Sequence, residues 1–289
     1  MNYVNVKRHG GMGDVIMVLC IAKQLNDHGY KIRYSTTPSL IDFIKNQPYI
    51  DDVIDTRITD GLDFDGIEHD ERFNKNRAVK NDPASTAFIS YTNFTFPNLN
   101  IQKDLLNYDI QYPLEFKEKV LNCFSSYPKP WILLNTMASA SNRSLPMELN
   151  QQIQTNYNGP GTIFWLGNRN LLEKNNIVTL LGPGLFEYIA AIDCCDALIT
   201  TNTSSLHLGF AFNKTIISIE QSWKAIDYAY NTKSNIISVS VDLDCLGCNF
   251  HNGCKIENNE AFLKLWDFQG YPKCSHIPVE SILNAINKI

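Results

Sequence analysis

The sequence lacks any apolar segment that approaches the ~20 residues needed for a membrane-spanning helix. Its first residues, 1–13, are polar and glycine-rich and have no apolar core like that of a secretory signal. Basic residues are not in excess, since 25 Lys and Arg against 30 Asp and Glu give a net charge of −5. The absence of a basic tail disfavours a protein held to nucleic acid or anionic lipid by charge. We therefore predict a cytoplasmic protein without a transmembrane segment.

The length and composition suit two domains of ordinary size. The chain has 289 residues, of which 44% are hydrophobic, enough for a sizeable core. Apolar strands alternate with helical patterns along most of the chain. Strands separated by single helices predict parallel, right-handed, doubly wound sheets. The expected fold is α/β, with two Rossmann-like domains facing across a cleft.

Two series of elements divide the chain. The first domain, residues 1–127, contains three expected strands (3–6, 31–35, 53–55), two helices (14–26, 38–46) and, from 59 to 107, loops and irregular structure. The second domain, residues 128–275, follows a proline-rich hinge. Its expected strands are 131–135, 162–166, 177–181, 197–200, 215–219 and 236–241, and its expected helices are 184–194 and 204–212. We expect the last segment, 276–289, to be an amphipathic helix that returns toward the first domain.

The first candidate site is the turn Gly10-Gly11-Met12-Gly13-Asp14, between a strand and a helix. Glycines let the backbone turn sharply and approach a ligand, and the helix start offers free N–H groups to a phosphate or polar substrate. The spacing is not a full G-x-G-x-x-G, which disfavours ordinary dinucleotide binding. No Tyr-x-x-x-Lys pair stands in a suitable helix, which disfavours a sugar-nucleotide epimerase. Asp14 suits a helix cap and a catalytic carboxylate alike, and both interpretations stay open.

The second candidate site is residues 200–207, which follow an apolar strand and open a helix. Hydroxyls and unpaired N–H groups at a helix start suit a diphosphate. His207 lies one turn into the helix, where it could reach the same oxygens or be a structural, half-buried histidine. Each domain thus has one polar helix start, and ligands of such folds bind beyond the carboxyl ends of the strands. This pairing predicts a ligand in the cleft between the domains.

The eight cysteines fall into two sets. Four lie in apolar surroundings and are expected to be buried, reduced thiols: Cys20, Cys123, Cys194 and Cys195. The other four lie in a polar segment, 245–274, with metal-like spacing: Cys245, Cys248, Cys254 and Cys274. In a cytosolic chain such a set favours a metal over disulfides, although unrelated thiols remain an alternative. A tetrahedral thiolate site would be structural, with zinc as the default ion and iron also possible.

Several segments resemble the heptosyltransferase family (glycosyltransferase family 9). The first is Arg8-x-Gly-Gly-x-Gly13-Asp14-Val15, followed by residues 46–54. Residues 142–146 are similar to the basic-x-Trp-Pro segment of the family, with Leu145 in place of Trp. Leu181-Gly182 and residues 202–211 are similar to its Leu-x-Gly and Asp-Ser-Gly-x-x-His-x-Ala-x-Ala signatures. Some heptosyltransferase-like enzymes that glycosylate autotransporters resemble this chain in having a cysteine finger. The resemblance implies the two-domain GT-B fold.

The resemblance also implies roles for these residues. Asp14 would be the general base of an inverting, metal-independent glycosyl transfer from a nucleotide-diphosphate sugar to a hydroxyl acceptor. Arg143 would neutralise the donor diphosphate, and the helix start at 203–207 would cradle it. The implied donor-binding set is Gly11, Gly13, Arg143, Asn202, Thr203, Ser204, Ser205 and His207. Asn202 replaces the acid of the family, so the resemblance does not extend to ADP-heptose as the donor.

Other functions and several acceptors stay open. The alternatives are an epimerase or phosphorylase of the same architecture, and a non-catalytic sugar-nucleotide-binding or interaction module. The acceptor could be a glycan, a protein side chain or a modified base of phage DNA. A DNA acceptor would require a local basic groove, for which the candidates are Arg72, Lys75, Arg77 and Lys80.

Overall fold

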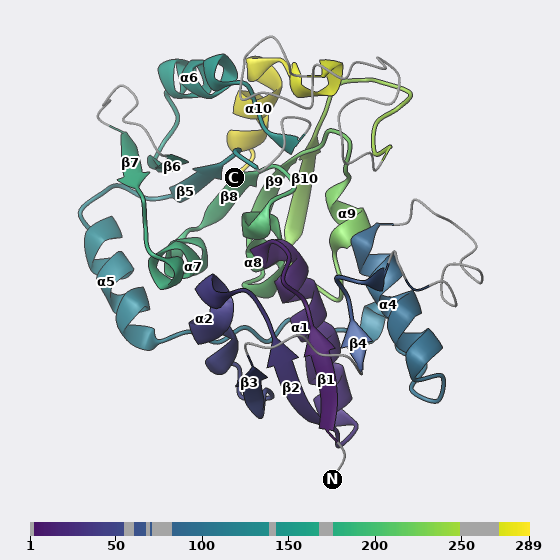
Figure 1. The fold of residues 1–289 in the computed structure, drawn as a ribbon. Coiled ribbons are helices and arrows are strands. Elements are labelled where there is room, and N and C mark those ends of the chain that lie inside the picture. The colour runs from purple at the N-terminus through teal and green to yellow at the C-terminus, as the bar shows by residue number, and fades with distance from the viewer. Residues whose placement is uncertain are drawn as a thin grey trace. The chain divides into compact units, whose positions relative to one another are not determined.

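A computed structural model of the protein describes residues 3–54, 61–67, 70, 83–138, 143–167, 176–248 and 272–289. The chain divides into two compact units. The first unit comprises Met1–Pro113 and Tyr228–Thr232, and the second comprises Leu114–Asp227 and Lys233–Ile289. Each unit is built on its own parallel sheet (Figure 1). Within the described ranges, no helix is long and apolar enough to cross a membrane.

The sheet of the first unit has the strand order β3-β2-β1-β4, and all its neighbouring strands are parallel. Its strands are β1 (Tyr3–Lys7), β2 (Lys31–Ser35), β3 (Asp52–Ile54) and β4 (Leu62–Asp63). Its helices are α1 (Met12–Asp27), η1 (Pro38–Leu40), α2 (Ile41–Lys45), α4 (Ala84–Thr95) and η3 (Lys103–Leu105). Helix α1 forms because residues 15–22 are apolar or small, and all of them are buried. This helix follows β1 directly, so its N-terminus lies at the carboxyl edge of the sheet.

The sheet of the second unit has the order β10-β9-β8-β5-β6-β7, again with all neighbours parallel. Its strands are β5 (Trp131–Asn135), β6 (Thr162–Gly167), β7 (Ile177–Leu181), β8 (Ala197–Thr200), β9 (Thr215–Ile219) and β10 (Asn235–Val239). Its helices are α5 (Leu114–Phe124), α6 (Met147–Asn156), α7 (Leu185–Cys194), α8 (Ser204–Ala211), η7 (Lys273–Ser275) and α10 (Val279–Ile286). The short helix α9 (Ala225–Tyr228) ends where the chain passes into the first unit. Helices α6 and α10 cover one face of the sheet, while α5, α7 and α8 cover the other (Figure 1).

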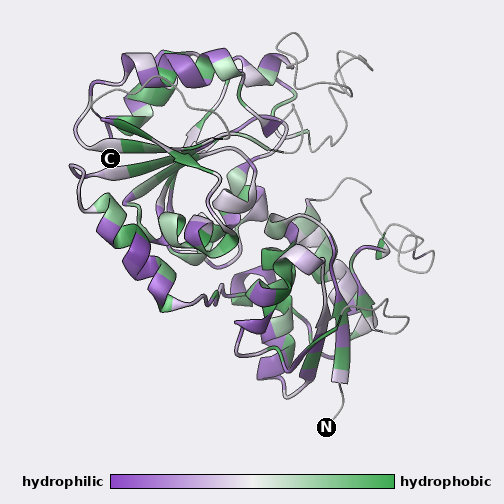
Figure 2. Ribbon diagram, turned by 60° about the vertical axis from the view of Figure 1, so that its left-hand side comes forward, coloured by the Kyte–Doolittle hydropathy of each residue, from purple (hydrophilic) through white to green (hydrophobic). Residues whose placement is uncertain are grey.

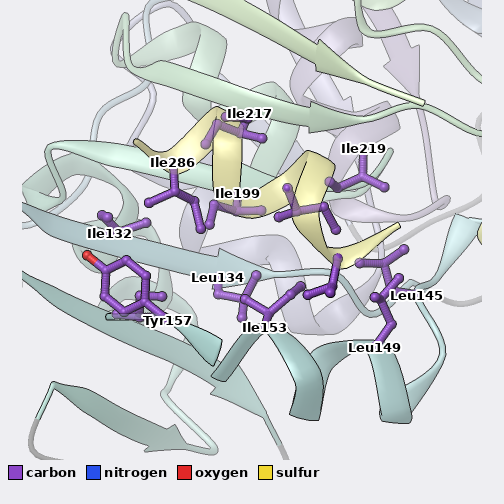
Figure 3. Close-up of a cluster of buried hydrophobic side chains, with 14 of the residues drawn as sticks. Ile132, Leu134, Leu145, Leu149, Ile153, Tyr157, Ile199, Ile217, Ile219 and Ile286 are labelled. Carbon is purple, nitrogen blue, oxygen red and sulfur yellow. The ribbon is translucent and has the colours of Figure 1, made fainter. Parts of the chain in front are cut away.

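The core of the second unit lies between its sheet and the helices α6 and α10. Strand residues such as Leu134, Ile199 and Ile217 meet Ile153 of α6 and Ile286 of α10 there (Figure 3). All these side chains are at most 5% exposed. The strands are hydrophobic along most of their length, whereas the helices carry hydrophilic residues between hydrophobic ones (Figure 2). Strands buried on both faces read as continuous apolar runs, which is why their bounds were predictable.

The structure corrects the expectation for residues 59–107. That range contains strand β4 and the three-turn helix α4, where we expected loops and irregular structure. Helix α4 lacks charged residues, and Phe88 and Tyr91 on its buried face pack edge-on against Phe64. A nearly all-neutral helix gives little contrast between faces, and this weakens the helical pattern in the sequence.

Residues 55–60, 68–69 and 71–82 lie outside the described residues, and with them Arg72, Lys75, Arg77 and Lys80.

A further expectation differs from the structure. The division between the units falls at residue 113 rather than near residue 128, because α5 packs with the second unit. Phe124 of α5 stacks on Phe164 of β6 with ring centroids 3.8 Å apart. The last helix, α10, belongs to the second unit and buries its apolar face in the core of that unit, through Ile282 and Ile286. Its expected return toward the first domain stays a prediction.

Candidate active site

The carboxylate of Asp14 lies in the first turn of α1 and does not cap the helix. Gly11 is the N-cap residue, and the structure shows no side-chain capping bond at this end. Asp14 instead accepts a hydrogen bond from the guanidinium of Arg8, with 2.5 Å between Nη2 and Oδ2. The Asp14 side chain is 34% exposed. The structure therefore shows an ion pair with Arg8 in place of the capping bond that the sequence left as an alternative, and the catalytic role of Asp14 stays a prediction.

The guanidinium of Arg8 is fixed by several groups of the first unit. Its Nη1 donates to the carbonyl oxygen of Phe64 (3.2 Å) and to Oδ1 of Asp65 (3.3 Å). The guanidinium carbon lies 5.3 Å from the centre of the Phe88 ring. It also lies against Gly10, where an added Cβ would approach the Cζ, Nε and Nη2 atoms of Arg8 to 2.7 Å. Gly10 thus makes room for an arginine of the protein itself rather than for a bound phosphate.

Burial lowers the pKa of Arg8, but the ion pair with Asp14 and the charge of Asp65 more than offset this effect. The net result is a pKa above the usual arginine value. Arg8 is consequently a permanent cation beside Asp14.

Asp65 links Arg8 to a second chain of hydrogen bonds. Its carboxylate accepts from the backbone N–H of His9 (2.9 Å) and lies 3.1 Å from His9 Nδ1. His9 Nε2 lies 3.0 Å from the hydroxyl of Ser35, at the end of β2. This connectivity is that of a Ser-His-Asp nucleophile, but Ser35 is completely buried, which leaves its hydroxyl closed to a substrate. We interpret the chain as a scaffold that holds the ends of β1, β2 and β4 together.

In the second unit, a network of hydroxyl groups surrounds the start of α8. Ser205 Oγ lies 2.6 Å from the hydroxyls of both Thr200 and Thr203 and accepts from the Asn135 amide at 3.1 Å. The phenol of Tyr188, on α7, lies 2.8 Å from Ser204 Oγ and also accepts from Asn135. Burial raises the pKa of Tyr188, although its hydrogen bonds to these residues act in the opposite direction. Tyr188 is thus a neutral phenol whose hydrogen bond orients Ser204.

Two polar atoms just before α8 have no hydrogen-bond partner among the described residues: Thr201 Oγ1 and Asn202 Nδ2. Buried polar groups are normally paired, so such atoms indicate a place for a partner that the protein does not supply. Thr201 is completely buried, as Ser35 is, whereas Asn202 is half-buried and is the one of the two that a ligand could approach. Thr203 is the N-cap of α8, and its side chain makes no capping bond. His207 differs from these residues because it is 3% exposed and packs edge-on to Phe210. This position favours a packing role for His207 over the direct phosphate contact that we expected.

Arg143 lies on the same sheet edge as the start of α8. The backbone N–H of Leu145 donates to the carbonyl of Thr136, just beyond the end of β5. Strands β5 and β8 are neighbours, with Asn135 paired to Thr200. The structure therefore brings the Arg143 segment and residues 202–205 to the carboxyl edge of two adjacent strands. Leu145, which replaces the tryptophan of the family motif, is completely buried in the core of the second unit.

The cysteine segment is described only in part. Cys254 lies outside the described residues, and no group of three or more metal-ligating side chains occurs among the residues that are described. The turn Cys245–Cys248 and the turn at Cys274 nevertheless share an anchor in Gln221. Its carbonyl accepts from the N–H of Gly247 (3.0 Å), and its amide donates to Ser275 Oγ (2.6 Å). Gly247 has φ +75°, as a tight Cys-x-x-Cys turn requires.

The sequence did not reveal several residues of these sites. Asp65 follows a strand of two residues, which is too short to give a pattern. Asn135 and Tyr188 contact the start of α8 from a strand and a helix that are distant in sequence. Arg8 opens the motif that resembles the family, but its role was not predicted from the sequence. His9 follows it, and its place at a carboxyl strand end was the signal that could have identified it.

Two units of parallel α/β structure, each with a polar helix start beyond its strands, define the GT-B class of fold. Solved structures of glycosyltransferases that are similar to this chain support this class. A family 9 glycosyltransferase from Veillonella parvula DSM 2008 superposes with a TM-score of 0.64 at 16% identity, over 99% of this chain and 96% of that chain. E. coli ADP-heptose lipopolysaccharide heptosyltransferase II superposes with a TM-score of 0.59 at 14% identity, over 100% of this chain and 98% of that chain.

A third similar structure is the iron-containing, dodecameric glycosyltransferase TibC of enterotoxigenic E. coli H10407. Its TM-score is 0.58 at 12% identity, over 99% of this chain and 76% of that chain. No family model matches the sequence, and no curated protein matches it significantly by sequence. The likeness to family 9 that the motifs indicate is therefore confirmed at the level of the fold.

Proposed function

We propose that the protein is an inverting glycosyltransferase, which moves a sugar from a nucleotide-diphosphate donor to a hydroxyl acceptor. The observation that carries this proposal is the start of α8. The amide nitrogen of the half-buried Asn202 has no partner there, next to an ordered set of hydroxyls and on the same sheet edge as Arg143. Helix N–H groups and an arginine are the donors that stabilise a diphosphate as it gathers negative charge on leaving.

The similar structures support a nucleotide-sugar donor. E. coli WaaC was solved with ADP, and TibC was solved with ADP-D-β-D-heptose. In this chain Asn202 stands where the family motif has an acid, so the base and sugar of the donor can differ from ADP-heptose. The acceptor classes that we propose are a glycan, a protein side chain or a modified DNA base.

The proposed chemistry uses Asp14 as the general base. The acceptor O–H bond breaks as a new bond forms from its oxygen to the anomeric carbon, and the proton passes to Asp14. The bond from the anomeric carbon to the diphosphate oxygen breaks, and the nucleoside diphosphate leaves from the opposite face, which inverts the anomeric centre. No metal takes part in these steps, because Arg143 and the start of α8 would neutralise the diphosphate.

A structural metal is a separate part of the proposal. Gln221 binds both the backbone of the Cys245–Cys248 turn and Ser275, next to Cys274, and this shared anchor supports a tetrahedral site completed by Cys254, although the three described thiols do not themselves form a ligand group. Such a closed site would hold zinc or iron and stabilise the fold without entering the reaction.

The function is tested first by a screen of nucleotide sugars with thermal unfolding. A donor that binds only the folded protein raises its stability by mass action, so one nucleotide class should raise the Tm in a concentration-dependent way. Candidate acceptors are then added with that donor, without divalent cations, and the anomeric configuration of the product is read by NMR. Retention of configuration, or no response to any nucleotide sugar, would argue against the proposal.

The two proposed roles should separate in variants. Asp14→Asn should bind the donor normally but lose ~10²–10⁴-fold in kcat, which is the usual contribution of a positioned base. Arg143→Ala should mainly weaken donor binding, because it removes charge-assisted bonds to the diphosphate. Near-normal turnover of Asp14→Asn at saturating substrates would remove Asp14 as the base.

The metal is tested by elemental analysis of protein purified without chelators. We expect about one zinc or iron ion per chain, as a tetrathiolate site binds a single ion. Cys248→Ser should lose the ion and Cys123→Ser, at an exposed thiol of α5, should retain it. Metal-free protein with wild-type stability would contradict the site.

A further inference from the structure

The carboxylate of Asp14 is held from one side. Its Oδ2 atom is engaged by Arg8, while its Oδ1 atom has no hydrogen-bond partner among the described residues. A base must present one oxygen to the incoming hydroxyl in a defined direction, and a displacement of ~1 Å can cost about 10²-fold in rate. A side chain in the first turn of a helix has no such direction unless a neighbour fixes it.

The guanidinium of Arg8, which fixes Asp14, is itself held in place by other groups. Arg8 is 18% exposed and is bound by the carbonyl of Phe64 and the carboxylate of Asp65, with its guanidinium against the Phe88 ring. A flexible arginine would gain little from a single exposed carboxylate. Here the Phe64 carbonyl, the Asp65 carboxylate and the Phe88 ring hold the guanidinium in addition to Asp14, so the arginine is in place to orient it.

We propose that Arg8 is a positioning residue for the base: it binds Oδ2 of Asp14 and thereby presents Oδ1 to the acceptor hydroxyl. Asp65 and Gly10 support it, the first by a hydrogen bond and the second by leaving the space that the guanidinium fills. The inference rests on the proposed function of Asp14. It goes beyond that function because it assigns the orientation of the base to a side chain that does not itself touch the substrate.

The test is a double-mutant cycle on turnover in the full-length protein. Arg8→Ala should lower kcat ~10–10²-fold by misplacing the base, and leave the dissociation constant of the donor unchanged. In the Asp14→Asn background the same Arg8→Ala change should have no further effect, because Arg8 acts only through Asp14. Arg8→Lys should recover part of the loss, and added guanidinium ion, below denaturing concentrations, should partly restore Arg8→Ala.

Gly10→Ala provides a variant that keeps every charge. The new Cβ would approach three atoms of the guanidinium to 2.7 Å, so the arginine must move away from Asp14. Turnover should fall in the wild-type background but not in the Arg8→Ala background. If Arg8→Ala does not fold, this variant and Arg8→Lys carry the test. The control is Arg33→Ala, which removes an arginine from a surface ion pair with Asp52 on the same unit and should leave kcat unchanged.

The outcomes distinguish the two proposals. If Asp14→Asn keeps its turnover, the proposed base is wrong and the inference falls with it. If Asp14→Asn loses turnover but Arg8→Ala and Gly10→Ala do not, only the positioning role is wrong. An equal loss from Arg8→Ala in both backgrounds would show that the arginine supports the fold rather than the base.

Discussion

At the scale of single residues, the start of α8 depends on side chains from two other elements. Tyr188 orients the hydroxyl of Ser204 at 2.8 Å, and Asn135 donates to Tyr188 and to Ser205. Tyr188→Phe would leave the packing of the ring intact and remove only the phenolic hydroxyl. We expect donor affinity to fall about 5-fold, the effect of losing a net hydrogen bond of about 1 kcal/mol, with kcat unchanged. Calorimetric titration of the donor would measure this, and a fall in kcat alone would contradict it.

The buried thiol of Cys195 gives a pH dependence. Burial raises its pKa to about 12, while an unfolded cysteine titrates near ~8.5. This difference contributes to the free energy of unfolding. The contribution is fully present below about pH 8.5 and is lost as the pH rises toward 12, at about 1.4 kcal/mol per pH unit. Between about pH 8 and about pH 10, the free energy of unfolding measured with urea should fall less for Cys195→Ala than for wild type. Cys123→Ala, at an exposed thiol, should follow wild type.

The residues of the site were predictable only where a local pattern marks them. Asp14 and residues 202–205 follow strands directly and open helices, and this was enough to find them. The partners that give them a function are distant in sequence: Asp65 lies 57 residues from Arg8, and Tyr188 lies 16 residues from Ser204. No periodicity links such pairs, because the sheet order decides which loops meet. His207 was found by the same motif; it is 3% exposed, and its contact with a ligand stays a prediction.

At the scale of elements, Phe124 is a central contact of α5 with the second unit, to which Phe116 adds a ring contact with Phe186 of α7. Phe124 is 1% exposed, stacks on Phe164 and meets Trp131 edge-on at 5.5 Å. Phe124→Ala should destabilise the second unit by about 3–5 kcal/mol, as for other buried phenylalanines. Leu121→Ala on the same helix changes a residue that is 37% exposed, so it should lower the free energy of unfolding by only about 0.5 kcal/mol. Urea unfolding followed by tryptophan emission would measure both, and similar costs for the two variants would contradict this account.

The strands were predicted better than the helices for a physical reason. Strands β5, β7, β8 and β9 have the bounds expected from the sequence, because each is an apolar run closed by polar or turn-forming residues. Helices α4, α5 and α6 were not predicted. Only two residues of α5, Val120 and Phe124, are buried. A helix that touches the core at so few points has a weak pattern, and its existence depends on tertiary packing. Helix α10 was recognised from its pattern, but the pattern does not say which sheet buries it.

At the scale of the whole molecule, the chain passes between the two units more than once. It leaves the first unit after residue 113, returns for residues 228–232 and then re-enters the second unit. The returning segment is held by hydrogen bonds within the first unit, including Asn231 N–H to the carbonyl of Leu106 (3.1 Å). Tyr230 stacks on Tyr108 with ring centroids 5.8 Å apart and is 5% exposed. A late segment of the sequence therefore completes the fold of the first unit.

This topology predicts a variant whose effect lies far from its place in the sequence. Tyr230→Ala should destabilise the first unit by about 3–5 kcal/mol, because it empties an aromatic site in that unit. The tryptophans among the described residues, Trp131, Trp165 and Trp223, all belong to the second unit. Circular dichroism follows both units, whereas the emission of these three tryptophans follows the second. The early part of the circular dichroism transition should therefore move to lower denaturant while the emission transition stays in place. Tyr3→Ala, at an exposed tyrosine of β1, should move neither. A shift of the emission transition by the same amount would mean that the returning segment stabilises both units as one cooperative body.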